Sequence, residues 1–488
     1  MCGFRYHTVD DPCDPDATER VVAAMSQHIL FLTGRLAERA LHRVLEGMQP
    51  TPFTYSVHVL GIQVAGLMTT DMIKRRLTSA MGADRVIVPG RCRGDLDGVS
   101  RALGVPFQRG PDDLKDLPKF FGRQGAPLDL SRYDVRIFAE IVDAPDLDVD
   151  GILRRAAAYA EAGADVIDLG CLPKTPFPHL EEAIAALHAA GYKVSVDSVD
   201  KTELLRGGKA GADFLLSLKT DTLWIADEVA AVPVLIPAKS GSLRSLLNAI
   251  EQMDRRGRPY LADPILDPIH FGFADSIVRY RELRRRAPDA EIMMGTGNLT
   301  ELTDADTLGM QAVLMGIVSE LRITNLLTTQ VSHHCAGVVR EADAARRMMY
   351  AARASESLPR GFGEALLALR ALDPFPYSRE EIEATAAEVK DPSFRVQISP
   401  DGLHIYNRDG MRTSSDPFAL FPQLGVEQDG SHAFYLGVEL ARAQIAWQLG
   451  KRYVQDQELD WGCAPVRRSE SIDAQCAPHT ASRTEVES

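Results

Sequence analysis

Three aspartates in the middle of the chain occupy positions where an unpaired charge would be costly. Asp197 lies in the apolar segment KVSVDS, and Asp263 and Asp267 are spaced by four residues in ADPILDP. Burial of a carboxylate without a partner is unfavourable, so a bound ligand would explain its presence in such a segment. We therefore take these side chains as candidates for ligand binding or catalysis. The alternative for Asp197 is a structural role as the N-cap of a helix predicted to begin near Lys201.

Further polar side chains lie at the ends of neighbouring apolar segments. They are Glu140, Asp168, Lys174, Ser217, Lys219, Lys239 and Asn298. The lysines could supply positive charge to an anionic ligand, as could the backbone amides of residues 295–298 at the start of a helix. A structural alternative stays open for each of them, because acids and serines at strand ends commonly cap the next helix and lysines in loops are commonly only solvated.

These residues can form one site only in a fold that brings the ends of several strands together. The alternation of strands and helices along the chain predicts such a fold. Between Tyr133 and Ala351, candidate strands alternate with amphipathic helices that often end at glycine. The strands are predicted at 135–142, 165–170, 193–198, 213–218, 232–237, 259–266, 291–296 and 311–316. Eight β/α units with strands that are apolar on both faces favour a closed (β/α)8 TIM barrel over an open doubly wound sheet. In such a barrel, the working residues lie at the C-terminal ends of the strands.

The order of several short motifs on these strands resembles that of dihydropteroate synthases. The motifs are EAGADVIDLGCLPKTP, KVSVDS, GKAGADFLLSL, ADPILDPIHFGF and MMGTGN. They are also similar to the pterin-binding domain of pterin-dependent methyltransferases, and the likeness covers residues 133–352. The resemblance implies a pterin-binding barrel in which Asp197 and Asp267 are the catalytic carboxylates, because one carboxylate accepts the adjacent N–H donors of a pterin edge bidentately. Asp263 stays a rival of Asp267, since the strand register decides which one points into the barrel.

The chain departs from the synthase pattern where diphosphate is held. Leu299 stands in GTGNLTE where the synthases have a lysine, and their final Arg-x-His is not recognisable in CAGVVREAD. Glu140 stands where the family has an asparagine. The GTGN segment instead resembles the Gly-x-Ser-Asn of the methyltransferases, which makes Asn298 a candidate pterin contact. His333 and His334 are candidates to replace the missing histidine, with a surface pair as the alternative.

The flanking segments predict two smaller domains. HILFLTG, then helices in GRLAERALHRVLEGM and TYSVHVLGI, then DRVIVPG predict an α/β domain over 27–124. An α+β domain is predicted over 360–463, with FRVQISPDGLHIYNRDG as a hairpin and 432–450 as a long helix. Residues 1–26 and 464–488 are predicted to be a disordered extension and tail. The three-part arrangement resembles dihydropteroate synthase-related proteins of organisms that make tetrahydromethanopterin-type cofactors.

Composition and charge oppose several classes of protein. A net charge of −14 disfavours general affinity for nucleic acid. The seven cysteines are scattered and never form CxxC, which argues against a disulfide framework and a structural zinc site. The N-terminus lacks the apolar core of a signal peptide, and the longest apolar stretch, near 57–68, is too short to cross a bilayer. We expect a cytoplasmic protein without a nucleic-acid or membrane partner.

Together these features predict a dihydropteroate synthase-like transferase. It would condense a 6-hydroxymethyl-dihydropterin diphosphate with an arylamine in methanopterin- or folate-type cofactor biosynthesis. The expected ligands are a pterin and an arylamine, with Mg²⁺ accompanying the diphosphate, no metal held by protein residues, and a homodimer left open. Two alternatives stay open: pterin-dependent one-carbon (methyl) transfer, and a non-catalytic pterin-binding scaffold.

Overall fold

The computed structural model describes residues 27–122 and 129–465. They form two compact units, one made of the chain up to Asp129 with residues 355–357, and the other of residues 130–354 and the chain from Leu358 onward. The predicted extension at 1–26 and most of the predicted tail lie outside the described residues. Within them, no helix has both the length and the apolar character that a membrane span requires.

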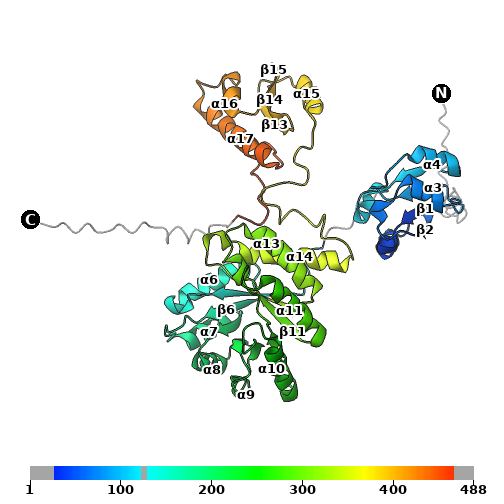
Figure 1. Cartoon of the computed structure of the whole chain (residues 1–488). Coiled ribbons are helices and arrows are strands. Elements are labelled where there is room, and N and C mark those ends of the chain that lie inside the picture. Colours follow the sequence, from blue (N-terminus) through cyan, green and yellow to red (C-terminus); the bar gives the residue numbers. More distant parts are fainter. Residues whose placement is uncertain (1–26, 123–128, 466–488) are drawn as a thin grey trace, which may run out of the picture. The chain divides into compact units, whose positions relative to one another are not determined.

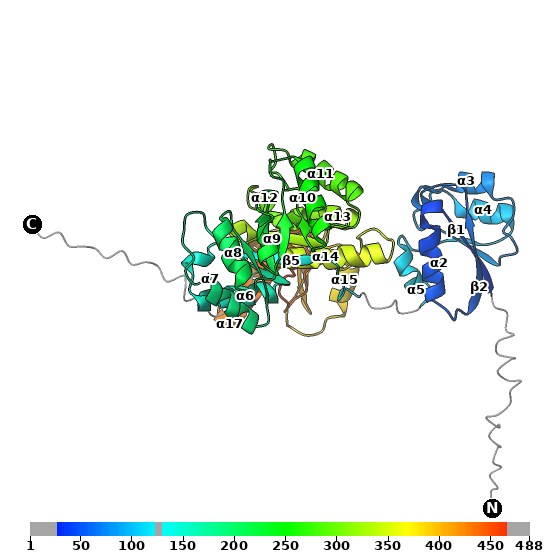
Figure 2. The same cartoon turned by 90° about the horizontal axis from the view of Figure 1, so that it is seen from below.

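The N-terminal unit is a parallel four-stranded sheet with helices on both faces. Its strands are β1 (Gln27–Thr33), β2 (Phe53–Val59), β3 (Arg85–Val88) and β4 (Phe107–Arg109), in the order β2-β1-β3-β4. Its α-helices are α2 (Glu38–Gly47), α3 (Thr70–Arg76), α4 (Leu96–Leu103) and α5 (Leu117–Phe120). Helices α2 and α5 cover one face of the sheet and α3 and α4 the other (Figure 2). The alternation of apolar side chains along β1 gives each face its own core.

The segment TYSVHVLGI, predicted as a helix, forms strand β2 instead. It pairs in parallel with β1 from Gln27 opposite Phe53 to Thr33 opposite Val59. Tyr55 and Val57 alternate with polar residues and pack on the core beneath α2. Alternating aromatic and β-branched side chains suit a half-buried strand, and this period of two decides against the helix.

The second unit contains a closed barrel of parallel strands, which confirms the predicted fold. The strands are β5 (Arg136–Ile141), β6 (Val166–Gly170), β7 (Lys193–Asp197), β8 (Phe214–Leu218), β9 (Val232–Leu235), β10 (Leu261–Ala262), β11 (Glu291–Gly295) and β12 (Asn325–Thr329). The helices around them are α6 (Val149–Glu161), α7 (Leu180–Ala189), α8 (Lys201–Lys209), α9 (Ile225–Glu228), α10 (Leu243–Arg256), α11 (Phe273–Arg286), α12 (Gly297–Thr300), α13 (Thr307–Glu320) and α14 (Val338–Ala354) (Figure 1). Most of the core lies between strands and helices.

The eighth strand does not lie at 311–316, where the sequence predicted it. Those residues belong to α13, and β12 closes the barrel by pairing with both β11 and β5. In α13 the side chains of Gln311, Leu314, Met315 and Val318 are buried at helical spacing. Helices apolar on most sides produce short runs such as QAVLMG, which periodicity alone does not separate from buried strands.

A small antiparallel sheet with its own core follows the barrel in the chain. Its elements are α15 (Arg379–Glu388), β13 (Arg395–Ser399), β14 (Gly402–Asn407), β15 (Gly410–Ser414), α16 (Pro417–Leu420) and α17 (Gly430–Leu449). The predicted hairpin is confirmed, with Ser399 opposite Gly402. The predicted long helix is also confirmed, and it ends at Gly450 in a left-handed conformation with φ of 68°.

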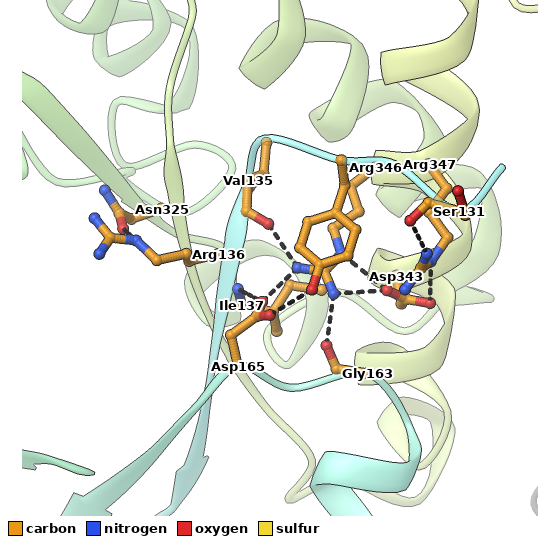
Figure 3. Close-up of polar contacts among 11 residues, drawn as sticks. Ser131, Val135, Arg136, Ile137, Gly163, Asp165, Asn325, Asp343, Arg346 and Arg347 are labelled. Carbon is orange, nitrogen blue, oxygen red and sulfur yellow. Dashed lines mark hydrogen bonds and ion pairs between the residues drawn. The ribbon is translucent and has the colours of Figure 1, made fainter. Parts of the chain in front are cut away.

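Helix α14 is tied to the N-terminal ends of the barrel strands by a buried arginine (Figure 3). The side chain of Arg346 is 1% exposed and pairs with Asp165, which precedes β6, and with Asp343 at 2.7 Å. It also donates to the carbonyl of Val135 at 2.6 Å, and its guanidinium carbon lies 3.6 Å from the centre of the Tyr133 ring. This network belongs to the end of the barrel opposite the strand C-termini, so its role is structural.

Candidate active site

The barrel interior changes from apolar to acidic along its axis. A lower layer consists of Phe138, Val166, Phe214, Leu216, Val234, Leu261 and Met293. Side chains of a strand point inward at every second residue, so Glu140 lies two residues above Phe138, Asp168 above Val166 and Asp263 above Leu261. Asp197 ends β7 in the same way, two residues beyond buried Ser195. The strand ends therefore gather carboxylates at the C-terminal mouth.

Glu140, Asp168 and Asp197 form a close triad on three neighbouring strands. One carboxylate oxygen from each lies within 4.8 Å of the other two. Asp168 is fully buried, and its Oδ1 accepts a hydrogen bond from Ser195 Oγ at 2.5 Å. Its Oδ2 has no hydrogen-bond partner among the described residues. Nor does any donor or cation in the described parts of the chain offset the charges of Glu140 and Asp197.

Burial and mutual repulsion make ionisation of this triad unfavourable. Burial, and then the charge of Asp197, raises the pKa of Glu140 to about 8. Burial and then the charge of Glu140 raise the pKa of Asp168 to about 8, with a partial offset from the Ser195 hydroxyl. The pKa of Asp197 is also raised well above its ordinary value, by burial first and then by Asp168 and Asp263. The triad must therefore hold protons or be neutralised by a ligand.

The backbone of β6 leaves room for Glu140. Gly170 follows Asp168 on the same face of the strand, and a Cβ built there would lie 2.8 Å from Glu140 Oε1 and 3.0 Å from Val142 Cα. Any larger residue would displace the carboxylate or the loop after β5. Glycine at this position therefore permits the approach of Glu140 to the other two carboxylates.

The structure separates the two aspartates that the sequence left as rivals. Asp263 is buried at the end of β10, and its Oδ1 accepts hydrogen bonds from Tyr280 at 2.6 Å and from the Ile265 amide at 2.7 Å. Burial raises its pKa to about 6, although both donors and Arg279 oppose the shift. Asp267 lies on the following loop, where it pairs with Arg279 at 2.6 Å. Asp263, rather than Asp267, is the carboxylate whose charge reaches Asp197.

The remaining predicted residues lie at the same end of the barrel, outside the triad. Asn298 is exposed on α12, and its amide donates to the Leu266 carbonyl at 2.9 Å, which ties α12 to the loop after β10. Ser217 is half-buried on β8. Exposed lysines follow three strands: Lys174 after β6, Lys219 after β8 and Lys239 after β9. His334 bonds to the Thr300 carbonyl at 3.1 Å, and His333 is exposed.

Two features of the site were not predicted from the sequence. They are three exposed apolar side chains in the loops that follow the barrel strands, and the hydroxyl groups that hold the carboxylates in place. Val199 after β7 is 85% exposed, Phe271 after β10 is 81% exposed, and Val331 after β12 is 66% exposed. Their signal in the sequence was the presence of large apolar residues in segments that are otherwise typical of loops. Tyr280 and Ser195, which bond to the carboxylates, carried no recognisable signal because a helix core and a strand also account for them.

Oxygen-rich clusters of this kind suit hard divalent cations. In the described chain, no other group of three His, Cys, Asp or Glu side chains comes comparably close together. The four described cysteines are all unpaired. The arrangement can thus accept N–H donors, hold a proton, or hold a cation.

Comparison with known proteins finds a family that matches part of the chain and a related protein that matches most of it. Residues 27–112 match a family of unknown function, DUF6513. An uncharacterized protein of Methanocaldococcus jannaschii is 27% identical over 522 residues, which cover 88% of this chain and 98% of that protein. That alignment therefore extends over most of both proteins.

Several solved structures that resemble the chain are dihydropteroate synthases. The Yersinia pestis synthase in a sulfonamide drug complex is 16% identical, with 48% of this chain and 98% of that chain covered and a TM-score of 0.36. The Thermus thermophilus synthase in complex with 6HMPPP is 20% identical, with 46% and 95% covered and a TM-score of 0.35. The assignment of the barrel rests on its own strand pairing.

Proposed function

We propose that the mouth of the barrel binds a pterin and that the chain is a dihydropteroate synthase-like transferase. The observation that carries the proposal is the presence of two carboxylates at the ends of β7 and β10, half-buried Asp197 and buried Asp263, whose charges interact. The motif order on the barrel strands supports the same assignment, with Asp263 taking the role first given to Asp267.

The two carboxylates match the hydrogen-bonding edge of a pterin. Its amide N–H and amino group are adjacent donors, and an ionised carboxylate is an acceptor on both oxygens. Tyr280 and the Ile265 amide hold Asp263 Oδ1, so the carboxylate is oriented while Oδ2 stays available. Exposed Phe271 and Val199 supply apolar surface for the flat faces of a bicyclic ring. Donors that satisfy both acids offset the burial cost that now raises their pKa.

In the proposed reaction, the arylamine nitrogen attacks the pterin methylene carbon. The carbon–oxygen bond to diphosphate breaks, diphosphate leaves with the electron pair, and the amine nitrogen releases its proton to water. Carboxylate charge near the pterin stabilises cationic character at the methylene. Lys174, Lys219 and Lys239, exposed after their strands, supply positive charge for the leaving anion.

One observation favours pterin-dependent methyl transfer as the second candidate. Leu299, on α12 beside Asn298, is buried and only 6% exposed, so no cation replaces the synthase lysine there. Asn298 is exposed beside the same loop and is available to a pterin ring. Methyl transfer from a reduced pterin needs no site for diphosphate, which suits this substitution.

The deciding experiment is incubation of the full chain with dihydropterin diphosphate and either 4-aminobenzoate or a ribofuranosyl aminobenzene phosphate, with product followed by mass. We expect a coupled product from one arylamine, and its loss in Asp197→Asn and Asp263→Asn. Asp200→Asn, which removes a charge three residues beyond Asp197, is the matched control and should retain activity. Pterin binding without product from either amine rejects the transferase, and absence of pterin binding rejects the site.

A further inference from the structure

The mouth of the barrel holds more acidic side chains than a pterin edge requires. Asp197 and Asp263 suffice for the proposed pterin contacts, which leaves Glu140 and Asp168 without a role. These two occupy opposite positions in β5 and β6, and Asp168 is fully buried. Asp168 Oδ2 has no hydrogen-bond partner in the described structure, although Oδ1 is held by Ser195 at 2.5 Å. A buried, oriented oxygen without a donor points to a ligand that supplies positive charge.

The separation of the three carboxylates suits a small ion. One oxygen each of Glu140, Asp168 and Asp197 lies within 4.8 Å of the others. Oxygens bonded to Mg²⁺ at roughly 2.1 Å are separated by at most about 4.2 Å, so small side-chain rotations bring the triad into coordination range. No lysine or arginine in the described chain offsets these charges. Three oxygen ligands from adjacent strands, with water in the open positions, are typical of hard divalent cations.

We propose that Glu140, Asp168 and Asp197 hold one hard divalent cation of the Mg²⁺ or Mn²⁺ type. Ser195 orients Asp168, and Gly170 gives Glu140 the space to approach. Asp197 has two oxygens, so one can face the cation while the other faces the pterin side of the mouth. The site consists of protein residues alone, and it stands whether or not the proposed transferase reaction occurs.

The test uses Mn²⁺ itself, titrated into the full chain without pterin, with free Mn²⁺ followed by electron paramagnetic resonance. We expect one site per chain, displaced by Mg²⁺. Glu140→Gln and Asp197→Asn should each weaken it by roughly tenfold or more. Asp200→Asn removes an exposed charge from the same loop, and asparagine remains a good N-cap, so this matched control should bind as the wild type does. Binding should tighten between pH 6 and 8.5 with release of protons, because the ligands must be deprotonated.

Thermal unfolding separates loss of the site from loss of the fold. With a chelator present, Glu140→Gln should be at least as stable as the wild type, because it removes repulsion from an uncompensated cluster. With Mn²⁺, the midpoint should rise for the wild type and Asp200→Asn but not for Glu140→Gln.

Two results would overturn the cation site: no binding by the wild type at millimolar Mn²⁺ and pH 8.5, or equal affinity in Glu140→Gln and the wild type. Neither result bears on the proposed function, because pterin affinity is measured separately with the chelator present. Asp263→Asn completes the separation, since it should weaken pterin binding and leave Mn²⁺ affinity within about twofold of the wild type.

Discussion

Glu140 of β5 and Asp168 of β6 are directly opposite each other in neighbouring strands, and both side chains point into the barrel. Asp197 on β7 completes the triad. Three acids in one buried region cannot all be ionised cheaply without a partner. The stability of the barrel should therefore depend on whether these three acids are protonated and on whether a ligand is bound to them.

The stability of the cation-free protein should decrease as pH rises from about 4 to 8. Burial raises the pKa of Glu140 from 4.5 to about 8 and that of Asp168 from 3.8 to about 8. The folded state therefore keeps protons that the unfolded chain has released, and each group contributes up to about 1.4 kcal/mol of lost stability per pH unit within this window. Urea unfolding with a chelator should show a flatter decline in Glu140→Gln. Parallel curves for the two proteins would mean that Glu140 titrates normally.

Asp263→Asn should weaken pterin binding, and Asp267→Asn should not. Removal of a charge-assisted acceptor from a buried ligand costs about 2 kcal/mol of binding free energy. Asp267 pairs with Arg279 at 2.6 Å, so its replacement should lower the thermal midpoint instead. Calorimetric titration with 6-hydroxymethylpterin and thermal unfolding on both variants make the comparison. The reverse pattern would restore Asp267 as the pterin contact.

Asp197 should contribute to pterin binding, whereas Asp200 should contribute to the stability of the fold. The Asp200 side chain caps α8, where Oδ1 accepts from the Thr202 amide at 2.7 Å, so the cap role considered for Asp197 belongs to Asp200. Asp200→Ala should lower the free energy of unfolding by about 1 kcal/mol with pterin affinity intact. Asp197→Asn should weaken binding without loss of stability. A lowered midpoint with unchanged affinity in Asp197→Asn would make this residue structural.

Gly170→Ala should disturb the triad through a single methyl group. The added Cβ would lie 2.8 Å from Glu140 Oε1, so Glu140 or the loop after β5 must move, at a cost of about 1–3 kcal/mol. We expect a lower thermal midpoint and weaker Mn²⁺ binding. Gly309→Ala is the matched control, because a Cβ there meets nothing within 4 Å and alanine favours the helix. An unchanged midpoint in Gly170→Ala would show that Glu140 has more space than the geometry indicates.

Arg346→Met should destabilise the barrel without changing its mouth. The variant leaves Asp165 and Asp343 without the guanidinium that joins α14 to the strands (Figure 3), and the loss should be about 3 kcal/mol or more. Arg379→Met removes an exposed pair with Glu383 and should cost less than about 1 kcal/mol. Chemical unfolding measures both. A similar small loss in the two variants would remove Arg346 from the structural core.

At several points, strand register and side-chain burial could not be predicted from the sequence. Asp263 and Asp267 are equally plausible in ADPILDP, and only the end of β10 at Ala262 decides that Asp263 turns inward. The error at 311–316 has a related cause: the exposed face of α13 carries Gly309 and Val313, so few polar residues mark its helical period. Strand β12 reads NLLTT and is short, with an asparagine and two threonines among its five residues, so it lacks the continuous apolar run by which the other strands were predicted.

By itself, the sequence determined the alternation of strands and helices, seven of the barrel strands, and the position of each acid near a strand end. Those features are local, because apolar spacing and turn residues act within a few positions of the chain. Only the tertiary structure decided which acids meet. Closure of the barrel brings residues 28 and 29 positions apart in the chain, Glu140 with Asp168 and Asp168 with Asp197, into one close triad. Strand register and burial set those separations and raise the pKa values, and both depend on contacts between distant segments.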